Sequence, residues 1–197
     1  MTAVVLAAGA AFALWMLARR CAYRRGIELG GTPYVPLALL CAVTVLAGHG
    51  NSIAARAALL PIGAAALVDA RCGYVFDPLV VAGLGVVCAV AALDGRAVEA
   101  ALGAVTVAPV LLLLRLVSPR GFGLGDVKLA AVVGSGFGPS DGLMAMGTAF
   151  IVGGASAVVL LALGRVKLGE RIPFVPYVLA GSLFVLAYHR LRAGVFS

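Results

Sequence analysis

Long apolar runs alternate with short polar segments along the chain, and this alternation dominates the sequence. Most runs approach the roughly 20 residues that a helix needs to cross the hydrocarbon core of a bilayer. The pattern predicts an all-α, polytopic transmembrane helix bundle of about eight spans, with six as the lower limit. The expected spans cover residues 2–18, 34–48, 53–68, 78–93, 97–117, 127–138, 142–163 and 174–189, of which 127–138 is short for a span.

The composition supports this interpretation. Of the 197 residues, 63% are hydrophobic and only 12% are charged, whereas a soluble domain is about half apolar and a quarter charged. Disorder requires the opposite balance, with low hydrophobicity and high charge. Eight helices of ~20 residues leave no room for a separate soluble domain. We therefore expect one integral membrane domain over residues 1–197.

The net charge of +7 arises from 15 basic and 8 acidic residues. Lys and Arg collect in cytoplasmic loops of membrane proteins, so the excess does not predict nucleic-acid binding. The arginines of the first apolar run follow it, unlike those of a signal peptide, and predict an uncleaved first span with its N-terminus outside. Eight alternating spans then leave only four of the 15 basic residues outside: Arg56, Arg96, Arg190 and Arg192.

Acidic residues beside the spans are the candidates for chemistry, because a carboxylate in or near a membrane is costly. Five of the eight acids fall in expected loops, where solvation explains them. These five are Glu28, Asp94, Glu99, Asp141 and Glu170. The remaining three, Asp69, Asp77 and Asp126, lie at the expected cytoplasmic ends of spans.

Asp69 ends one apolar run and Asp126 opens another, which places both at one membrane face. Two carboxyl groups a few ångströms apart cannot both ionise cheaply, so they share a proton. One then serves as the base for an attacking water while the other protonates the carbonyl or the leaving amine, as in aspartic proteases. Because a helix C-terminus disfavours negative charge and an N-terminus favours it, we predict that Asp69 holds the shared proton and Asp126 is the base.

No other catalytic set competes with this pair. The two histidines, His49 and His189, lie near expected outside ends. The cysteines form no CxxC pair, so we expect no zinc site, no disulfide and no cofactor. The four cysteines are Cys21, Cys41, Cys72 and Cys88.

Glycines surround the second aspartate. Gly123 and Gly125 precede Asp126 and permit close backbone approach and unusual φ values, so we expect an extended substrate to lie against this loop. Gly134 and Gly138 form a GxxxG arrangement that favours close helix packing.

Three motifs carry a family resemblance. Residues 123–129, Gly-Leu-Gly-Asp-Val-Lys-Leu, resemble the GxGDxKL signature of type IV prepilin peptidases, which are membrane aspartyl proteases. Residues 69–71, Asp-Ala-Arg, resemble the first catalytic aspartate of that family with its following basic residue. Residues 172–177, Ile-Pro-Phe-Val-Pro-Tyr, resemble the I-P-F-x-P segment that opens its last helix. The resemblance covers about residues 60–180, which we take as the peptidase core.

The resemblance implies an aspartic endopeptidase in the bacterial inner membrane, multi-pass, with its active site facing the cytoplasm. It implies catalytic roles for Asp69 and Asp126, and substrate contacts for Gly123 and Gly125. Lys128 would have a supporting role, steadying the charge on Asp126 or reaching lipid phosphates. The implied partners are membrane lipids and prepilin or pseudopilin substrates, which carry a basic leader, a glycine at the cleavage point and a hydrophobic helix.

The chain departs from the family pattern after the first aspartate. The family usually continues to Ile-Pro-Asn, whereas this chain reads Val75-Phe76-Asp77 with the proline at Pro78. Asp77 either tunes the aspartate pair or caps the next helix, and the Asp-Pro sequence favours capping. Larger members also carry an N-terminal cytoplasmic domain with paired CxxC motifs, linked to N-methylation. We expect the short form that lacks this methyltransferase and zinc domain.

Three alternatives stay open. A presenilin-type GxGD protease usually has Tyr-Asp as its first motif, but here Val68 precedes Asp69. A non-proteolytic membrane transporter, or an assembly factor for a pilus or secretion system, would use the paired aspartates for proton or cation binding, although no internal repeat is visible. A degenerate relative would keep the fold without turnover. The oligomeric state and the residues that read the leader are not indicated.

Overall fold

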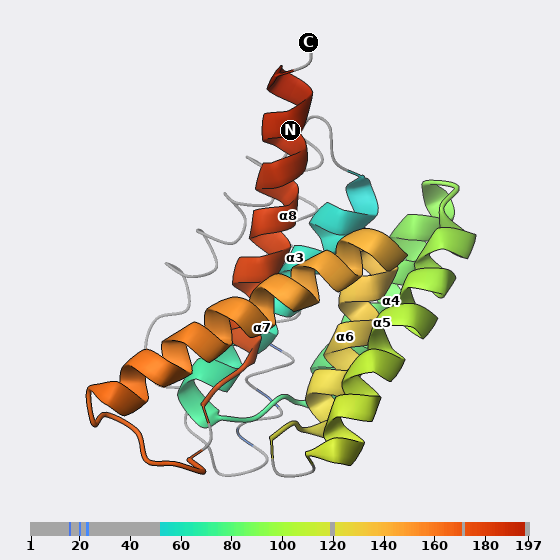
Figure 1. Cartoon of the computed structure of the whole chain (residues 1–197). Helices are drawn as coiled ribbons and strands as arrows, with labels where there is room; N and C mark the ends of the chain where they lie inside the picture. Colours follow the sequence, from blue (N-terminus) through green and yellow to red (C-terminus); the bar gives the residue numbers. More distant parts are fainter. Residues whose placement is uncertain are drawn as a thin grey trace.

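The computed structural model describes residues 52–118, 121–170 and 172–195, together with Met16, Arg20 and Tyr23 nearer the N-terminus (Figure 1). All regular secondary structure within these residues is helical. The helices are α3 (Ile53–Cys72), α4 (Asp77–Leu93), α5 (Ala97–Val117), α6 (Leu124–Phe137), α7 (Pro139–Ala162) and α8 (Val175–Val195).

These helices fall on six of the expected apolar runs, which confirms the all-α fold. The expected spans at 2–18 and 34–48 lie outside the described residues, so the count of eight and the outside N-terminus stay predictions. Among the described helices, α3, α5 and α7 are long and apolar enough to cross a membrane, and α4 is a shorter apolar helix. Helix α6 has only 14 residues, as its short apolar run predicted.

Local sequence sets the helix ends. Ser52 caps α3 by accepting the N–H of Ala55 at 3.1 Å, and α3 ends at Gly73 in a left-handed conformation. Pro78 lies in the first turn of α4, and Pro139 opens α7. The missing N–H of a proline costs nothing there, because the first amides of a helix have no partner within it.

Helix α3 forms the centre of the bundle. Of its apolar stretch 72% is buried, against 22% for α5 and 17% for α7. The core joins α3 to α4, α6 and α8 through side chains such as Ile62, Phe76, Leu129 and Val185. Helices α5 and α7 present apolar side chains outward, which suits helices whose solvent is lipid.

The links between helices fall at two ends of the bundle. The α3–α4, α5–α6 and α7–α8 links lie at the lower end in Figure 1, and the α4–α5 and α6–α7 links lie at the upper end. Two close contacts lie on the segments around the upper links: the ion pair of Arg96 with Glu99, and His189 Nε2 with Asp141 Oδ2 at 2.8 Å. Two of the acids assigned to outside connections are therefore paired rather than merely solvated.

Helices α5 and α6 approach closely where Gly103 faces Gly134. A Cβ built on Gly103 would lie 2.0 Å from the carbonyl oxygen of Gly134, and one built on Gly134 would lie 2.2 Å from that of Gly103. The predicted role of Gly134 in close helix packing is confirmed. Gly138 lies at the same crossing, because a Cβ built on Gly103 would lie 3.0 Å from its carbonyl carbon, and it also ends α6 at a φ of 82°.

Replacing Gly134 by alanine should lower the thermal midpoint of the protein in detergent micelles. The added Cβ forces α5 and α6 apart, and overpacking of this kind costs about 1–3 kcal/mol. Gly147→Ala on α7 is the matched control, because nothing lies within 4 Å of its Cβ position. Equal midpoints for the two variants would contradict the close crossing.

Candidate active site

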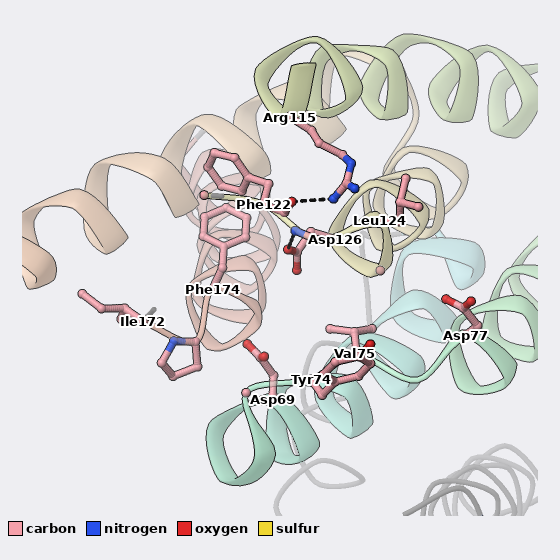
Figure 2. Close-up of a pocket in the computed structure, with 15 residues that line it drawn as sticks. Asp69, Tyr74, Val75, Asp77, Arg115, Phe122, Leu124, Asp126, Ile172 and Phe174 are labelled. Atoms are coloured by element: carbon pink, nitrogen blue, oxygen red, sulfur yellow. Dashed lines mark hydrogen bonds between the residues drawn. The ribbon is translucent and has the colours of Figure 1, made fainter. Parts of the chain in front are cut away.

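Asp69 and Asp126 line one cavity of about 400 Å³ at the lower end of the bundle. Asp69 belongs to the last turn of α3 and Asp126 to the first turn of α6. Figure 2 shows both carboxyl groups directed into the same space, and the two interact electrostatically. The fold therefore brings together the two acids that were predicted to pair, while their catalytic roles stay a prediction.

A backbone amide and an arginine fix the surroundings of Asp126. Its Oδ2 accepts the N–H of Gly123, the residue that begins α6, at 2.8 Å. The carbonyl of the same peptide group, from Phe122, accepts a hydrogen bond from Arg115 at 2.7 Å. One peptide unit therefore connects Arg115 to Asp126, and the guanidinium charge also acts on that carboxylate. Arg115 sets the direction in which the Gly123 amide points.

Asp69 is held by a different helix from the one that carries it. The residue is 6% exposed, and its Oδ2 accepts the N–H of Val175, the first residue of α8, at 3.0 Å. Asp69 and Asp126 lie at the predicted ends of their own helices, but the contact of Asp69 with α8 was not predicted. The unfavourable C-terminus of α3 is opposed by the N-terminus of α8, so each aspartate has a helix start as its partner.

The expected unusual φ values are absent from the glycines before Asp126. Gly123 has a φ of −81° and a ψ of 159°, and Gly125 lies within α6 without a positive φ. The close approach is real, but its partner is the chain itself: a Cβ on Gly125 would lie 2.8 Å from the Cβ of Val75. Gly125 is needed here because the segment after Asp69 packs against the start of α6.

Lys128 forms an ion pair with Asp77 at 2.9 Å, and both side chains are roughly half exposed. The predictions that Lys128 steadies Asp126 and that Asp77 caps α4 are therefore not what the structure has. Phe76 begins α4 without a side-chain cap. Lys128 does not contact Asp126 because the two lie two residues apart on α6 and therefore point to different sides of the helix. Lys128 therefore reaches sideways to α4.

Aromatic side chains form one wall of the cavity. Phe122 and Phe174 line it, and both rings pack on Phe150 of α7 with centroids 5.1–5.6 Å apart. Tyr74, which is half exposed, lies across the cavity from Phe174 in Figure 2. The sequence reasoning missed Arg115 and Phe150. The sequence analysis used Arg115 only as one of the basic residues on the cytoplasmic side. Its place just before the glycine loop could have identified it as a residue of the site.

Other predicted residues have simpler surroundings. Glu170 accepts the backbone N–H of Lys167 at 2.9 Å within the α7–α8 link. Cys72 and Cys88 are free thiols. Four of the residues considered above lie outside the described part of the chain: Cys21, Glu28, Cys41 and His49.

The sequence matches one family of known proteins. Residues 56–158 match the sequence model of the type IV leader peptidase family. The matched stretch is slightly more than half of the chain and includes both aspartates, Arg115 and the ion pair between Asp77 and Lys128. Searches of curated proteins and of solved structures found no match.

A double-mutant cycle on Asp77 and Lys128 measures the contact between α4 and α6. Since both side chains are roughly half exposed, Asp77→Asn and Lys128→Met should show a coupling of about 0.2–1 kcal/mol in thermal unfolding. The coupling should fall at high salt, because exposed charges are screened. Additive effects at low salt would show that the pair is absent.

Proposed function

Because the chain belongs to the type IV leader peptidase family, we propose that it is a membrane-embedded aspartic endopeptidase that removes the leader from prepilins or pseudopilins. The observation that carries the proposal is that Asp69 and Asp126, from different helices, face one cavity. The family supports a peptidase, and the paired carboxyl groups support the aspartic type. No observation favours the transporter or assembly-factor alternative.

The surroundings of the pair support one shared proton. Burial and mutual repulsion disfavour two charges in the same cavity, so one carboxyl group is neutral. The helix ends do not decide which, because each aspartate accepts an amide at a helix start. The positive charge of Arg115 acts on Asp126 and favours its ionised form. Asp126 is therefore the proposed base and Asp69 the proposed acid.

The hydrolysis then follows the general course of an aspartic protease. The carboxylate of Asp126 takes a proton from a water molecule, and the water oxygen adds to the scissile carbonyl carbon. The carboxyl proton of Asp69 moves to the carbonyl oxygen. When the tetrahedral intermediate collapses, Asp126 gives its proton to the leaving amine and Asp69 recovers its own from the hydroxyl group.

The lining of the cavity supports a substrate with a small residue at the cleavage point and a hydrophobic segment after it. A glycine requires the least room beside the two carboxyl groups, and the aromatic wall of Phe122 and Phe174 suits the hydrophobic helix that follows. Gly123 and Gly125 both line the cavity and are proposed contacts for the substrate backbone. Of the two, Gly123 has the freer surface, because Val75 fills the space beside Gly125.

The proposed location is the bacterial inner membrane, with the aspartate end of the bundle facing the cytoplasm. The outward apolar side chains of α5 and α7 support contact with membrane lipids. Cytoplasmic loops are enriched in Lys and Arg. On the described residues, the aspartate end and its links carry Arg71, Arg115, Lys128, Arg165 and Lys167.

Asp69→Asn and Asp126→Asn should each abolish leader removal when the chain is co-expressed with candidate pilin precursors. The loss should be about 10³-fold or more, because residues that act as a unit fail together. Asp94→Asn, an exposed acid at the opposite end, is the matched control and should process normally. Leader removal that persists in either variant would exclude the paired-acid mechanism, and no removal by the unaltered chain would exclude the proposed substrates.

Arg115→Met should lower kcat by roughly 10-fold or more while the protein still folds. The variant keeps the apolar length of the side chain but removes a charge-assisted hydrogen bond and the cation that favours ionised Asp126. Arg192→Met, exposed in the last turn of α8, controls for the loss of one positive charge. An unchanged kcat in Arg115→Met would show that the hydrogen bond from Arg115 to the Phe122–Gly123 peptide group does not contribute to catalysis.

A further inference from the structure

The contact between Asp69 and α8 joins residues 106 positions apart in the chain. Val175 is the first residue of α8, and the next residue, Pro176, has no N–H. The N–H of Tyr177 bonds back to the carbonyl of Phe174 at 3.0 Å. The first turn of α8 therefore directs the amide of Val175 at Asp69, and the amide of Phe174 adds a weaker contribution.

We infer that the Val175 amide is a positioning donor that orients Asp69 for catalysis and decides which of its two oxygens carries the proton. The inference rests on the proposed function. In a neutral carboxyl group the carbonyl oxygen is a stronger acceptor than the hydroxyl oxygen, so the N–H of Val175 favours Oδ2 as the carbonyl oxygen and places the proton on Oδ1. Asp69 thus keeps a single orientation, with its O–H available to the scissile carbonyl.

The packing around Val175 keeps its amide in place. The Val175 side chain is fully buried in the core. The neighbouring ring of Phe174 packs between Phe122 and Phe150 on the cavity wall, and α8 packs on α3 and α7. A donor fixed by three helices cannot follow a moving carboxyl group, so the position of Asp69 is set by α8. The I-P-F-x-P segment thereby has a positioning role. It supplies the amide of Val175, and Pro176 leaves no N–H at the next position.

Val175→Pro tests this role, because proline at the first position of a helix is compatible with the helix backbone and has no N–H to donate. The ring carbon that replaces the hydrogen also displaces the Asp69 carboxyl group. Val175→Ala is the matched control, which loses similar side-chain packing and keeps the amide. We expect Val175→Pro to lower kcat by roughly 10- to 100-fold relative to Val175→Ala, with KM changed less than about 3-fold. Equal kcat values would overturn the inference.

Hydrogen exchange of the Val175 amide tests its contact with Asp69. This measurement requires neither an activity assay nor the proline variant. In the unaltered chain the Val175 amide should exchange slowly, and Asp69→Ala should speed its exchange at least about 10-fold, because its acceptor is gone. Asp126→Ala removes the other carboxyl group and should leave this amide protected. Unchanged exchange in Asp69→Ala would overturn the inference. If the unaltered chain removes no leader, the proposed function fails while exchange still decides whether α8 holds Asp69.

Discussion

Two carboxyl groups can occupy one small cavity only if fixed hydrogen-bond donors hold them there. Left alone, like charges move apart or turn toward water. In this bundle the holding groups are backbone amides, from Gly123 for Asp126 and from Val175 for Asp69. Amides belong to the helix starts, and among substitutions only a change to proline removes one. The geometry of the site is therefore only as firm as the packing of α6 and α8 against α3.

Three further contacts join the segments around the cavity, and their strengths differ. The ion pair of Asp77 and Lys128 is roughly half exposed, so it contributes at most about 1 kcal/mol. The contact of Val75 with Gly125 leaves no room for even one methyl group, and disturbing such packing costs about 1–3 kcal/mol. The charge-assisted bond from Arg115 to Phe122 is of a kind that contributes about 1.5–3 kcal/mol. Close packing, rather than surface charge, keeps the segment after Asp69 in register with α6.

The helices and the two aspartates could be predicted from the sequence because each depends on a local property. Apolar runs mark helices, and the cost of an acid near a membrane marks Asp69 and Asp126. Val175 could not be predicted in the same way, because a backbone amide has no side-chain signature and its partner is distant in the chain. Helix geometry alone could have predicted that Lys128 points away from Asp126. The GxGDxKL motif instead suggested a contact between these two residues. The partner of Gly125 depended on tertiary packing, which no local pattern records.

The rings of Phe122, Phe150 and Phe174 interlock the glycine loop, α7 and the start of α8. Both amide donors therefore belong to segments that are braced by the same ring on α7, a helix with no acid near the cavity. The wall of the cavity formed by these rings is therefore closely packed, whereas Tyr74 on the other side is half exposed. For the proposed peptidase, this leaves the Tyr74 side as the one from which an incoming peptide gains its clearance. Tolerance for bulkier cleavage sequences would then be governed by the segment after Asp69, the stretch that differs from the Ile-Pro-Asn of the family pattern.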